Sequence, residues 1–325
     1  MNYGDGSQLR EAFAVIAIVC QHENRRQFAK TKAGTPRYRC KDCGKTWTES
    51  TEVLGGMRIG MDRAAEIINL LCEGMAVRAV ARITDTSKTT ILELLNYVGE
   101  RCEAYMLEHF RGLHVDDVQV DELWQYIYCK AATAHHKKIV GGVGDSYTYT
   151  AIERHTKLLI CWEFGRRDSS HAHAFCRKLN AATVGRFHLS SDAFGVYEQA
   201  VTWNLGGRVD YGQVIKIFGS QSKTEQRRYS PARIIGSKRR AVLGHPERER
   251  ICTSHCERMN GSIRHFTKRM ARLTCAFSKR WDNHRAALAV FFMHYNYCKK
   301  HSSLKGHTPA MAHGLALEVW GVKVT

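Results

Sequence analysis

Three acidic residues, Asp121, Asp192 and Glu257, stand where a carboxylate needs a partner or a bound cation. Asp121 lies in the middle of the alternating, strand-like run 118–128, where an unpaired carboxylate is unfavourable to bury. Asp192 directly follows the strand-like run 187–191, at the strand end where open α/β sheets place ligands. Glu257 lies near the start of a basic helical segment. Each acid alone has a structural explanation in an ion pair or a helix cap, but together they predict a site for divalent cations.

Three carboxylates that converge on one point support a specific chemistry. They supply hard oxygen ligands, which suit Mg²⁺ or Mn²⁺, and such sites hold two ions about 4 Å apart. One ion activates the attacking oxygen and the other stabilises the leaving oxygen, so the protein needs no covalent nucleophile. The predicted reaction is metal-dependent attack on a phosphodiester.

The elements that must position these acids follow from the spacing of the apolar residues. The runs 118–128, 147–152 and 158–164 predict three consecutive strands of an antiparallel meander. Residues 169–179 predict a helix, and residues 187–191 predict a fourth strand. Three strands, a helix and a strand is the order of an RNase H-like domain, an α/β fold with a mixed sheet. In that fold a central strand, a neighbouring strand end and a late helix converge.

Changes in composition and in the spacing of apolar residues along the chain predict the domain organisation. Residues 1–50 form a degenerate zinc-ribbon-like segment, and residues 57–110 form an all-helical domain. The predicted RNase H-like catalytic domain covers residues 115–305 and contains a basic loop at 221–250. A short tail follows at 306–325.

The charge of the chain indicates a polyanionic partner. Lysine and arginine number 49 against 31 acidic residues, which gives a formal net charge of +18. Nucleic acid is the commonest partner of such a protein, although a merely basic soluble protein has the same composition. The 12 cysteines are scattered, which favours reduced thiols and the cytosol. No apolar run is long enough to span a bilayer, so we expect a cytoplasmic protein without a membrane partner.

Residues 77–90 have the pattern of a helix-turn-helix. After a helix that begins at Met61, residues 77–83 predict a second helix, residues 84–86 a turn, and Ser87 the N-cap of a third helix. The last helix of this motif enters the major groove of DNA with its first residues toward the bases. An ordinary helical hairpin in a core has the same pattern. The predicted DNA-reading residues are Ser87, Lys88, Thr89 and Thr90.

The amino-terminal segment contains one Cys-x-x-Cys pair, Cys40 and Cys43, followed by a glycine that permits a tight turn. A structural zinc ion needs four ligands, and Cys20 and His22 are the candidates for the other two. A complete ribbon would usually have a second Cys-x-x-Cys pair, whereas here the position holds Glu23. The segment therefore predicts either a zinc site or a ribbon-like hairpin without metal.

Basic residues recur at helical spacing after Glu257. Such a run is usually a solvated helix face, but beside a metal-binding acid it favours contacts with DNA phosphates. The candidate residues are Arg258, Arg264, Lys268 and Arg269.

Several blocks of the sequence resemble the bacterial insertion-sequence-one transposases, which belong to the Asp-Asp-Glu superfamily. The resemblance covers about residues 57–315. Residues 117–124 are similar to the family's first-aspartate block, residues 191–194 to its second-aspartate block, and residues 253–260 to its glutamate block.

This resemblance implies a DNA transposase that binds the terminal inverted repeats of an insertion element and carries out metal-dependent strand cleavage and strand transfer. It implies that Asp121, Asp192 and Glu257 hold two Mg²⁺ or Mn²⁺ ions. Ala193 stands where many members have glycine, and Cys256 where an aliphatic residue is usual, but neither departure removes a metal ligand. Because two element ends must be brought together on double-stranded DNA, a homodimer or larger assembly in the bacterial nucleoid is implied.

Two other functions stay open on the sequence. A non-catalytic DNA-binding regulator derived from a transposase would use the zinc-ribbon-like segment and the helix-turn-helix, and would not need three converging carboxylates. A standalone RNase H-type nuclease would have no sequence preference and would not need the helix-turn-helix.

Overall fold

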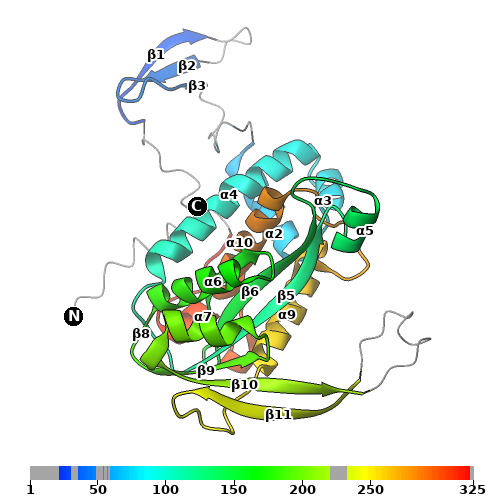
Figure 1. The fold of residues 1–325 in the computed structure, drawn as a ribbon. Coiled ribbons are helices and arrows are strands. Elements are labelled where there is room, and N and C mark those ends of the chain that lie inside the picture. The colour runs from blue at the N-terminus through cyan, green and yellow to red at the C-terminus, as the bar shows by residue number, and fades with distance from the viewer. Residues whose placement is uncertain are drawn as a thin grey trace. The chain divides into compact units, whose positions relative to one another are not determined.

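The computed structural model describes residues 22–30, 36–48, 54, 57, 59–219 and 233–322 (Figure 1). Contacts divide the chain into two compact units, Met106–Ile263 and the combination of Met1–Tyr105 with Arg264–Thr325. We expected the domain that carries the sheet to continue to residue 305, whereas this unit ends at Ile263. All three predicted catalytic acids lie in the unit Met106–Ile263.

Met106–Ile263 is an α/β unit built on a six-stranded mixed sheet, in the order β11-β10-β9-β5-β6-β7. Strands β5 (Asp117–Ile127), β6 (Gly144–Glu153) and β7 (Leu159–Gly165) form an antiparallel meander. The three consecutive strands predicted from the sequence are therefore confirmed, as is the mixed α/β class. β5 is a central strand, and its apolar side chains Val118 and Val120 are completely or almost completely buried.

The remaining strands extend the sheet from β5. β9 (Phe187–Asp192) pairs in parallel with both β5 and β10 (Val209–Phe218), and β10 pairs antiparallel with β11 (Ile234–Leu243). The strand β11 corrects our expectation of a loop throughout 221–250, of which residues 220–232 lie outside the described part of the chain. Most side chains of β11 are exposed and several are basic, so the strand is held by backbone pairing with β10 and has no apolar period to detect.

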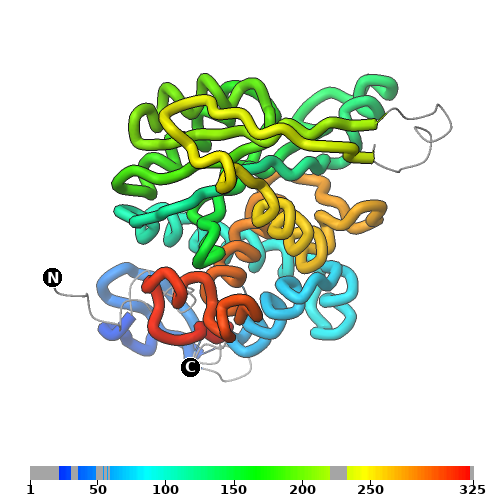
Figure 2. Tube along the Cα trace, turned by 90° about the horizontal axis from the view of Figure 1, so that it is seen from below, coloured from blue at the N-terminus to red at the C-terminus, as the bar shows by residue number. Residues whose placement is uncertain are grey.

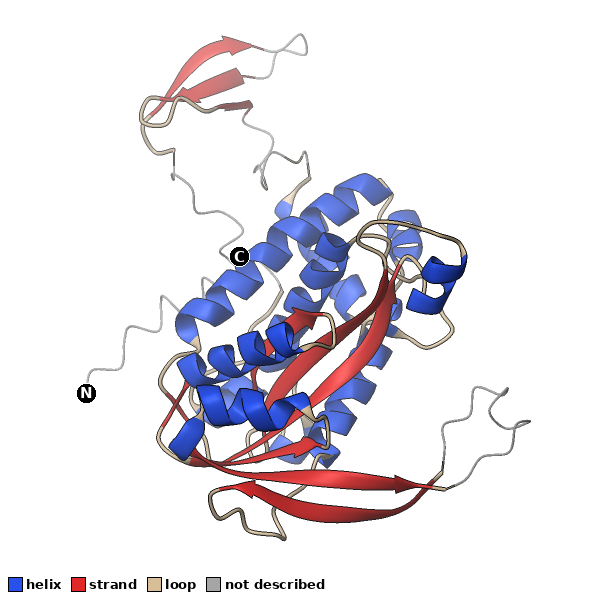
Figure 3. Cartoon of the chain, in the orientation of Figure 1, coloured by secondary structure: helices blue, strands red, loops and turns tan. Residues whose placement is uncertain are grey.

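Helices cover both faces of this sheet (Figures 2 and 3). α6 (Ser169–Ala182) and α7 (Val196–Asn204) pack against each other on one face, and α9 (Ser254–Phe266) lies on the other. Asp121 of β5 contacts α9, and the adjacent Glu122 points to the opposite face because side chains alternate along a strand. The shorter elements of the unit are β4 (Leu113–His114), which pairs with β8 (Thr183–Val184), α5 (Ala131–His136) and the 3-10 turn η3 (Gly206–Arg208).

The second unit is mainly helical. Its amino-terminal helices are α2 (Met61–Cys72), α3 (Val77–Ile83) and α4 (Lys88–His109), which agree with the predicted helical segment. α10 (Trp281–Tyr297) is buried along nearly its whole length. Because a helix that is buried on nearly all sides must be surrounded, α10 packs with α2 and α4, which explains why residues after Ile263 join this unit. The remaining elements are η4 (Lys268–Met270), η5 (Ser302–Leu304) and α11 (Pro309–His313).

Within this unit α4 and α10 approach closely at Gly99. A Cβ atom at Gly99 would lie 2.5 Å from the Cα atom of Ala286, so a backbone would have to move. We expect Gly99→Ala to lower the free energy of unfolding by about 1–3 kcal/mol. Gly261→Ala is the matched control, because Gly261 is also helical and a Cβ atom added there would have no other atom within 4 Å; it should gain about 0.5–1 kcal/mol. Urea unfolding measures the free energy of unfolding of both variants. A change of the same sign in the two variants would contradict the prediction.

The amino-terminal residues of the described chain form a three-stranded antiparallel sheet. Its strands are β1 (Arg25–Lys30), β2 (Pro36–Cys40) and β3 (Thr46–Thr48), in that order. Trp47 stacks with Tyr38 across the β2–β3 pair at a ring distance of 6.2 Å.

None of the helices in the described ranges is both long and apolar enough to cross a membrane. The longest of them, α4, has 22 residues and carries acidic and basic side chains along its length.

Candidate metal centre

The pairing of β5 with β9 brings Asp121 and Asp192 together. The two strands are parallel, and Gln119 of β5 is in register with Ser190 of β9. Asp121 and Asp192 each lie two residues beyond that pair, at the same level of the sheet. Carboxylate oxygens of Asp121, Asp192 and a third acid, Glu122, all lie within 4.8 Å of one another. Two of the three predicted catalytic acids therefore share one site.

Glu122 is the member of this cluster that the sequence analysis did not assign to the site. Its side chain is only 2% exposed and its Oε1 atom is buried; burial raises the pKa of this carboxyl, and the hydroxyl of Tyr197 lies close enough to act in the opposite direction with a smaller effect. Its Oε2 atom accepts hydrogen bonds from Nε and Nη2 of Arg167, both at 3.2 Å. The position of Glu122 in a predicted central strand could have indicated its role. Both faces of a central strand are covered, so the second of two adjacent acids is buried as well.

Arg167, which follows β7, connects two acids of the cluster. Besides its hydrogen bonds to Glu122, its Nη2 atom lies 3.9 Å from Oδ2 of Asp192. The guanidinium group is held over the ring of Phe194, at 4.1 Å from the ring centroid. Arg167 thus supplies one fixed positive charge on the α6–α7 side of the cluster.

The start of α9 is anchored to β5 two residues before Asp121. Gln119 is completely buried, and its side-chain oxygen accepts a hydrogen bond of 2.8 Å from the backbone N–H of His255. The backbone oxygen of Gln119 accepts a hydrogen bond of 3.0 Å from the thiol of Cys256. These contacts fix which residues of α9 face the acid cluster.

The residues of α9 that face the cluster are Glu257 and Asn260. Asn260 Nδ2 donates a hydrogen bond of 2.8 Å to Oδ2 of Asp121. Glu257 Oε1 accepts hydrogen bonds from Lys216 Nζ at 2.6 Å and from Thr253 Oγ1 at 3.0 Å. Glu257 is therefore not one of the three acids within 4.8 Å, but its charge is close enough to raise the pKa of Asp121.

The electrostatics of the cluster favour a bound cation. Burial, and then repulsion from the carboxylate of Asp192, raises the pKa of Asp121 to about 7 and that of Glu122 to about 8. Lys216 acts in the opposite direction on Asp121, because its positive charge lowers the pKa of that carboxyl. A divalent cation would stabilise all of these carboxylates in the charged form.

The donor set fits a hard divalent cation. Asp121, Glu122 and Asp192 offer carboxylate oxygens, which are the ligands that Mg²⁺ and Mn²⁺ prefer. The buried Oε1 of Glu122 has unused acceptor capacity, and Asn260 orients Asp121 as a supporting residue of a metal ligand would. The structure thus contains an acidic cluster that could hold a metal ion at the position predicted from the sequence.

A second cluster of metal-binding side chains lies in the amino-terminal sheet. His22, Cys40 and Cys43 offer one ligand atom each, all within 4.8 Å of one another. Sγ of Cys43 lies 3.3 Å from Nδ1 of His22, and the His22 ring stacks on Trp47. Three of the four predicted zinc ligands are therefore gathered, and the fourth, Cys20, lies outside the described residues.

We expect this cluster to bind one zinc ion, and Cys43→Ser to weaken that binding at least about 100-fold, because a hydroxyl is a much poorer zinc ligand than a thiolate. Cys275→Ser is the matched control, since Cys275 is also an exposed free cysteine and is not part of the cluster. Metal analysis after dialysis against a zinc buffer measures the difference. Equal zinc content in the two variants would rule out Cys43 as a ligand.

The structure also shows the local environment of the predicted DNA-reading residues. Ser87 caps α4, because its Oγ accepts a hydrogen bond of 3.1 Å from the backbone N–H of Thr90. The predicted N-cap is therefore confirmed. Ser87, Lys88 and Thr89 are exposed at the start of α4, and Thr90 is half-buried.

The four basic residues predicted to contact phosphates differ in their surroundings. Arg258 and Lys268 are exposed, and Arg264 is half-buried. The guanidinium group of Arg269 is turned inward, where Nη1 donates a hydrogen bond of 2.7 Å to the backbone oxygen of Asn283. The periodicity of the basic run did not distinguish this residue from its exposed neighbours.

The chain matches no protein-family model and no curated protein.

Proposed function

We propose that the protein is a DNA transposase of the Asp-Asp-Glu type, which cuts and joins DNA strands at the ends of an insertion element. The observation that carries this proposal is the convergence of Asp121 and Asp192 from two parallel strands, beside a helix that carries Glu257. The resemblance of the surrounding sequence blocks to the insertion-sequence-one transposases supports the same assignment.

In this proposal Asp121, Asp192 and Glu257 hold two Mg²⁺ or Mn²⁺ ions, and Glu122 is a further acid of the same cluster. When bound, such ions supply an activated attacking oxygen and stabilise the charge on the leaving oxygen of a phosphodiester. The side chain of Asn260 orients Asp121, and Arg167 balances part of the negative charge.

The order of the elements supports an RNase H-like catalytic domain. The meander β5-β6-β7 is followed by α6, by the parallel strand β9 and, after an insertion, by α9. This is the order in which an RNase H-like domain brings a central strand, a neighbouring strand end and a late helix together. The hairpin of β10 and β11 lies between the second and third predicted acids.

Several features support DNA as the substrate. The net charge of +18 favours a polyanion. α3 and α4 are joined by a short turn, and the exposed residues Ser87, Lys88 and Thr89 at the start of α4 are of the types that reach base edges and phosphates. We infer that α3 and α4 are a helix-turn-helix that binds the inverted repeats. The zinc-ribbon-like sheet would add further contacts through its basic side chains.

The experiment that tests this function uses the full chain and a duplex that carries the inverted repeats flanking its gene. Cleavage at the repeat ends is expected with Mg²⁺ or Mn²⁺ and not with a chelator. A duplex of scrambled end sequence is the control and should not be cut at a defined position. Cleavage that is independent of divalent metal would contradict the proposal.

One observation favours a second candidate, a non-catalytic DNA-binding regulator. Glu257 is already neutralised by Lys216 at 2.6 Å, and an ion pair of this kind would stabilise the acids without a metal. A regulator would bind the same repeats with full affinity and leave them uncut with every divalent metal tested. The cleavage assay therefore separates the two candidates.

A further inference from the structure

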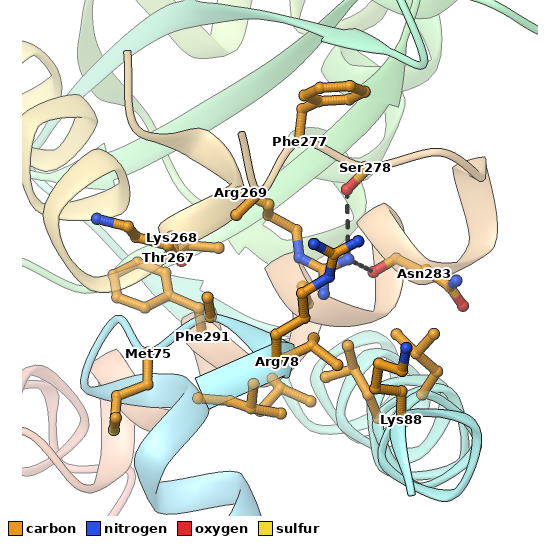
Figure 4. Close-up of a pocket in the computed structure, with 18 of the residues that line it drawn as sticks. Met75, Arg78, Lys88, Thr267, Lys268, Arg269, Phe277, Ser278, Asn283 and Phe291 are labelled. Atoms are coloured by element: carbon orange, nitrogen blue, oxygen red, sulfur yellow. Dashed lines mark hydrogen bonds between the residues drawn. The ribbon is translucent and has the colours of Figure 1, made fainter. Parts of the chain in front are cut away.

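The helical unit contains a cavity of about 400 Å³ that plays no part in the metal centre (Figure 4). It is lined by α2, the start of α3, α4, the segment 267–279 and α10, all of which belong to one compact unit. A volume of this size lies within the range of about 300–1,000 Å³ that is typical of small-molecule sites.

The walls of the cavity are largely apolar. Leu71 near the end of α2, Met75 in the loop after it, Leu92 from α4, and Phe277 and Phe291 line it. Side chains of this kind form flat apolar surfaces against which a ring can pack. A ligand in this cavity would pack an apolar or aromatic body against these walls.

The charged residues of the cavity are all cations. Arg78, Lys88, Lys268, Arg269 and Lys279 line it, and no acidic residue does. None of these five side chains forms an ion pair with a carboxylate among the described residues. Positive charges gathered without acids repel one another, so an anion bound among them is stabilised.

Arg269 is held in place by hydrogen bonds to the wall of the cavity. Its Nη1 atom donates hydrogen bonds to Oγ of Ser278 at 3.3 Å and to the backbone oxygen of Asn283 at 2.7 Å. Figure 4 shows Arg78 and Arg269 extending from opposite walls toward the same part of the cavity. Burial without a nearby acid lowers the pKa of Arg269 to about 10, which leaves it charged at neutral pH.

A buried hydroxyl in the cavity wall also lacks a partner. Thr267 is 5% exposed and lines the cavity, and its Oγ1 has no hydrogen-bond partner among the described residues. A buried hydroxyl that makes no hydrogen bond costs about 1–3 kcal/mol. A polar group of a ligand would satisfy it.

We propose that this cavity binds a nucleotide, with the phosphate between the cationic side chains and the base against the apolar wall. A phosphate matches the two guanidinium groups of Arg78 and Arg269 better than a single carboxylate does, because guanidinium groups bind phosphate oxygens with directed hydrogen bonds. The source is either a free mononucleotide or an unpaired nucleotide of bound DNA. The site goes beyond the proposed cleavage reaction, because none of its residues belongs to the acid cluster.

The test titrates the full chain with deoxyadenosine monophosphate, deoxyadenosine and inorganic phosphate by calorimetry. The monophosphate is expected to bind at least about tenfold more tightly than deoxyadenosine or inorganic phosphate alone. The reason is that its phosphate contacts the cationic side chains while its nucleoside contacts the apolar wall. Failure of the monophosphate to bind more tightly than inorganic phosphate overturns the proposal. Metal-dependent cleavage by the same preparation would be unaffected by that failure, so the two proposals fail separately.

Two variants and one matched control keep the test independent of folding. Arg78→Gln should weaken monophosphate binding about tenfold, whereas Arg82→Gln, one turn further along α3 and outside the cavity lining, should not. Thr267→Val should weaken binding while leaving the melting temperature unchanged or higher, because it removes an unsatisfied buried hydroxyl. Equal effects of Arg78→Gln and Arg82→Gln overturn the proposal.

A final arm identifies the source of the nucleotide. A duplex with one unpaired terminal nucleotide, and the same duplex with blunt ends, compete against the bound monophosphate. Competition by the unpaired end alone assigns the cavity to a nucleotide of DNA. Absence of competition by both duplexes assigns it to a free mononucleotide.

Discussion

Replacing Asp121 with asparagine is expected to lower metal-dependent cleavage of end-containing DNA by at least about 10³-fold. Asparagine keeps the shape of the side chain, but it removes a charge from the cluster that Asp121 shares with Glu122 and Asp192. It also weakens the contact with Asn260, which donates to Oδ2 of Asp121. Single-turnover cleavage at saturating protein measures the chemical step without the contribution of DNA binding.

The binding of the same DNA should change by less than about twofold, because phosphate contacts depend on basic residues outside the cluster. Glu249→Gln is the matched control: it also removes one carboxylate, but Glu249 is exposed and lies outside the acid cluster. It should cleave at the wild-type rate. Retention of cleavage by Asp121→Asn would show that Asp121 is not a metal ligand, and equal loss in both variants would point to net charge instead.

The acid cluster is expected to lower the stability of the metal-free protein as the pH rises from about 4 to about 8, against the opposite contribution of the buried His284 and His294, whose pKa values are lowered to about 3 and about 4. In the unfolded chain the carboxyls of Asp121 and Glu122 titrate near their ordinary pKa values of about 3.9 and 4.3. In the folded protein their pKa values are raised to about 7 and about 8, first by burial and then by Asp192. The folded state therefore binds more protons at these two carboxyls over this range, and the stability that the bound protons provide is lost as the pH passes through the folded pKa values.

Asp121→Asn removes one of these buried charges and should raise the free energy of unfolding at pH 8 by about 1–3 kcal/mol, with almost no effect at pH 4. Adding Mg²⁺ at pH 8 should stabilise the wild type more than the variant, because binding to the folded state is linked to folding. Urea unfolding at pH 4, 6 and 8, with and without Mg²⁺, measures both effects.

Asp210→Asn provides a control of opposite sign. Hydrogen bonds from Arg186 and from the backbone N–H of His245 hold the pKa of Asp210 well below its usual value. Removing this carboxylate should lower stability by a similar amount at pH 8 and pH 4, because the folded-state pKa of Asp210 lies far below 4 and the loss disappears only as the pH falls toward it. The difference in stability between the wild type and Asp121→Asn separates the cluster from the buried histidines, and a difference that does not change between pH 4 and pH 8 without metal would contradict the burial of Asp121.

Local patterns in the sequence were sufficient for the elements that carry the site. The alternation around Asp121 predicted β5, and the apolar runs after it predicted the meander with β6 and β7, because side chains of a strand alternate between its two faces. Ser87 was predicted as an N-cap from its residue type and position, since a cap depends on atoms only a few residues away. The predicted zinc ligands Cys40 and Cys43 are close in sequence and so were close in space.

Features that depend on distant neighbours appeared only in the tertiary structure. The burial of Glu122 depends on β9 and α7 being packed beside β5, and the contact of Asn260 with Asp121 depends on how Gln119 anchors α9. β11 escaped prediction because an exposed edge strand is held by backbone pairing rather than by apolar side chains.

The sequence by itself determined the strands and helices that carry Asp121, Asp192 and Glu257 and which acids stand in unusual places, because those properties depend on periodicity and capping within a few residues. Only the tertiary structure decided which acids share a site, which cation of a basic run turns inward, and that residues after Ile263 pack with the amino-terminal helices. The reason is physical: strand register, burial and electrostatic repulsion are set by groups that meet across the fold, and their energies depend on distances that the chain order does not specify.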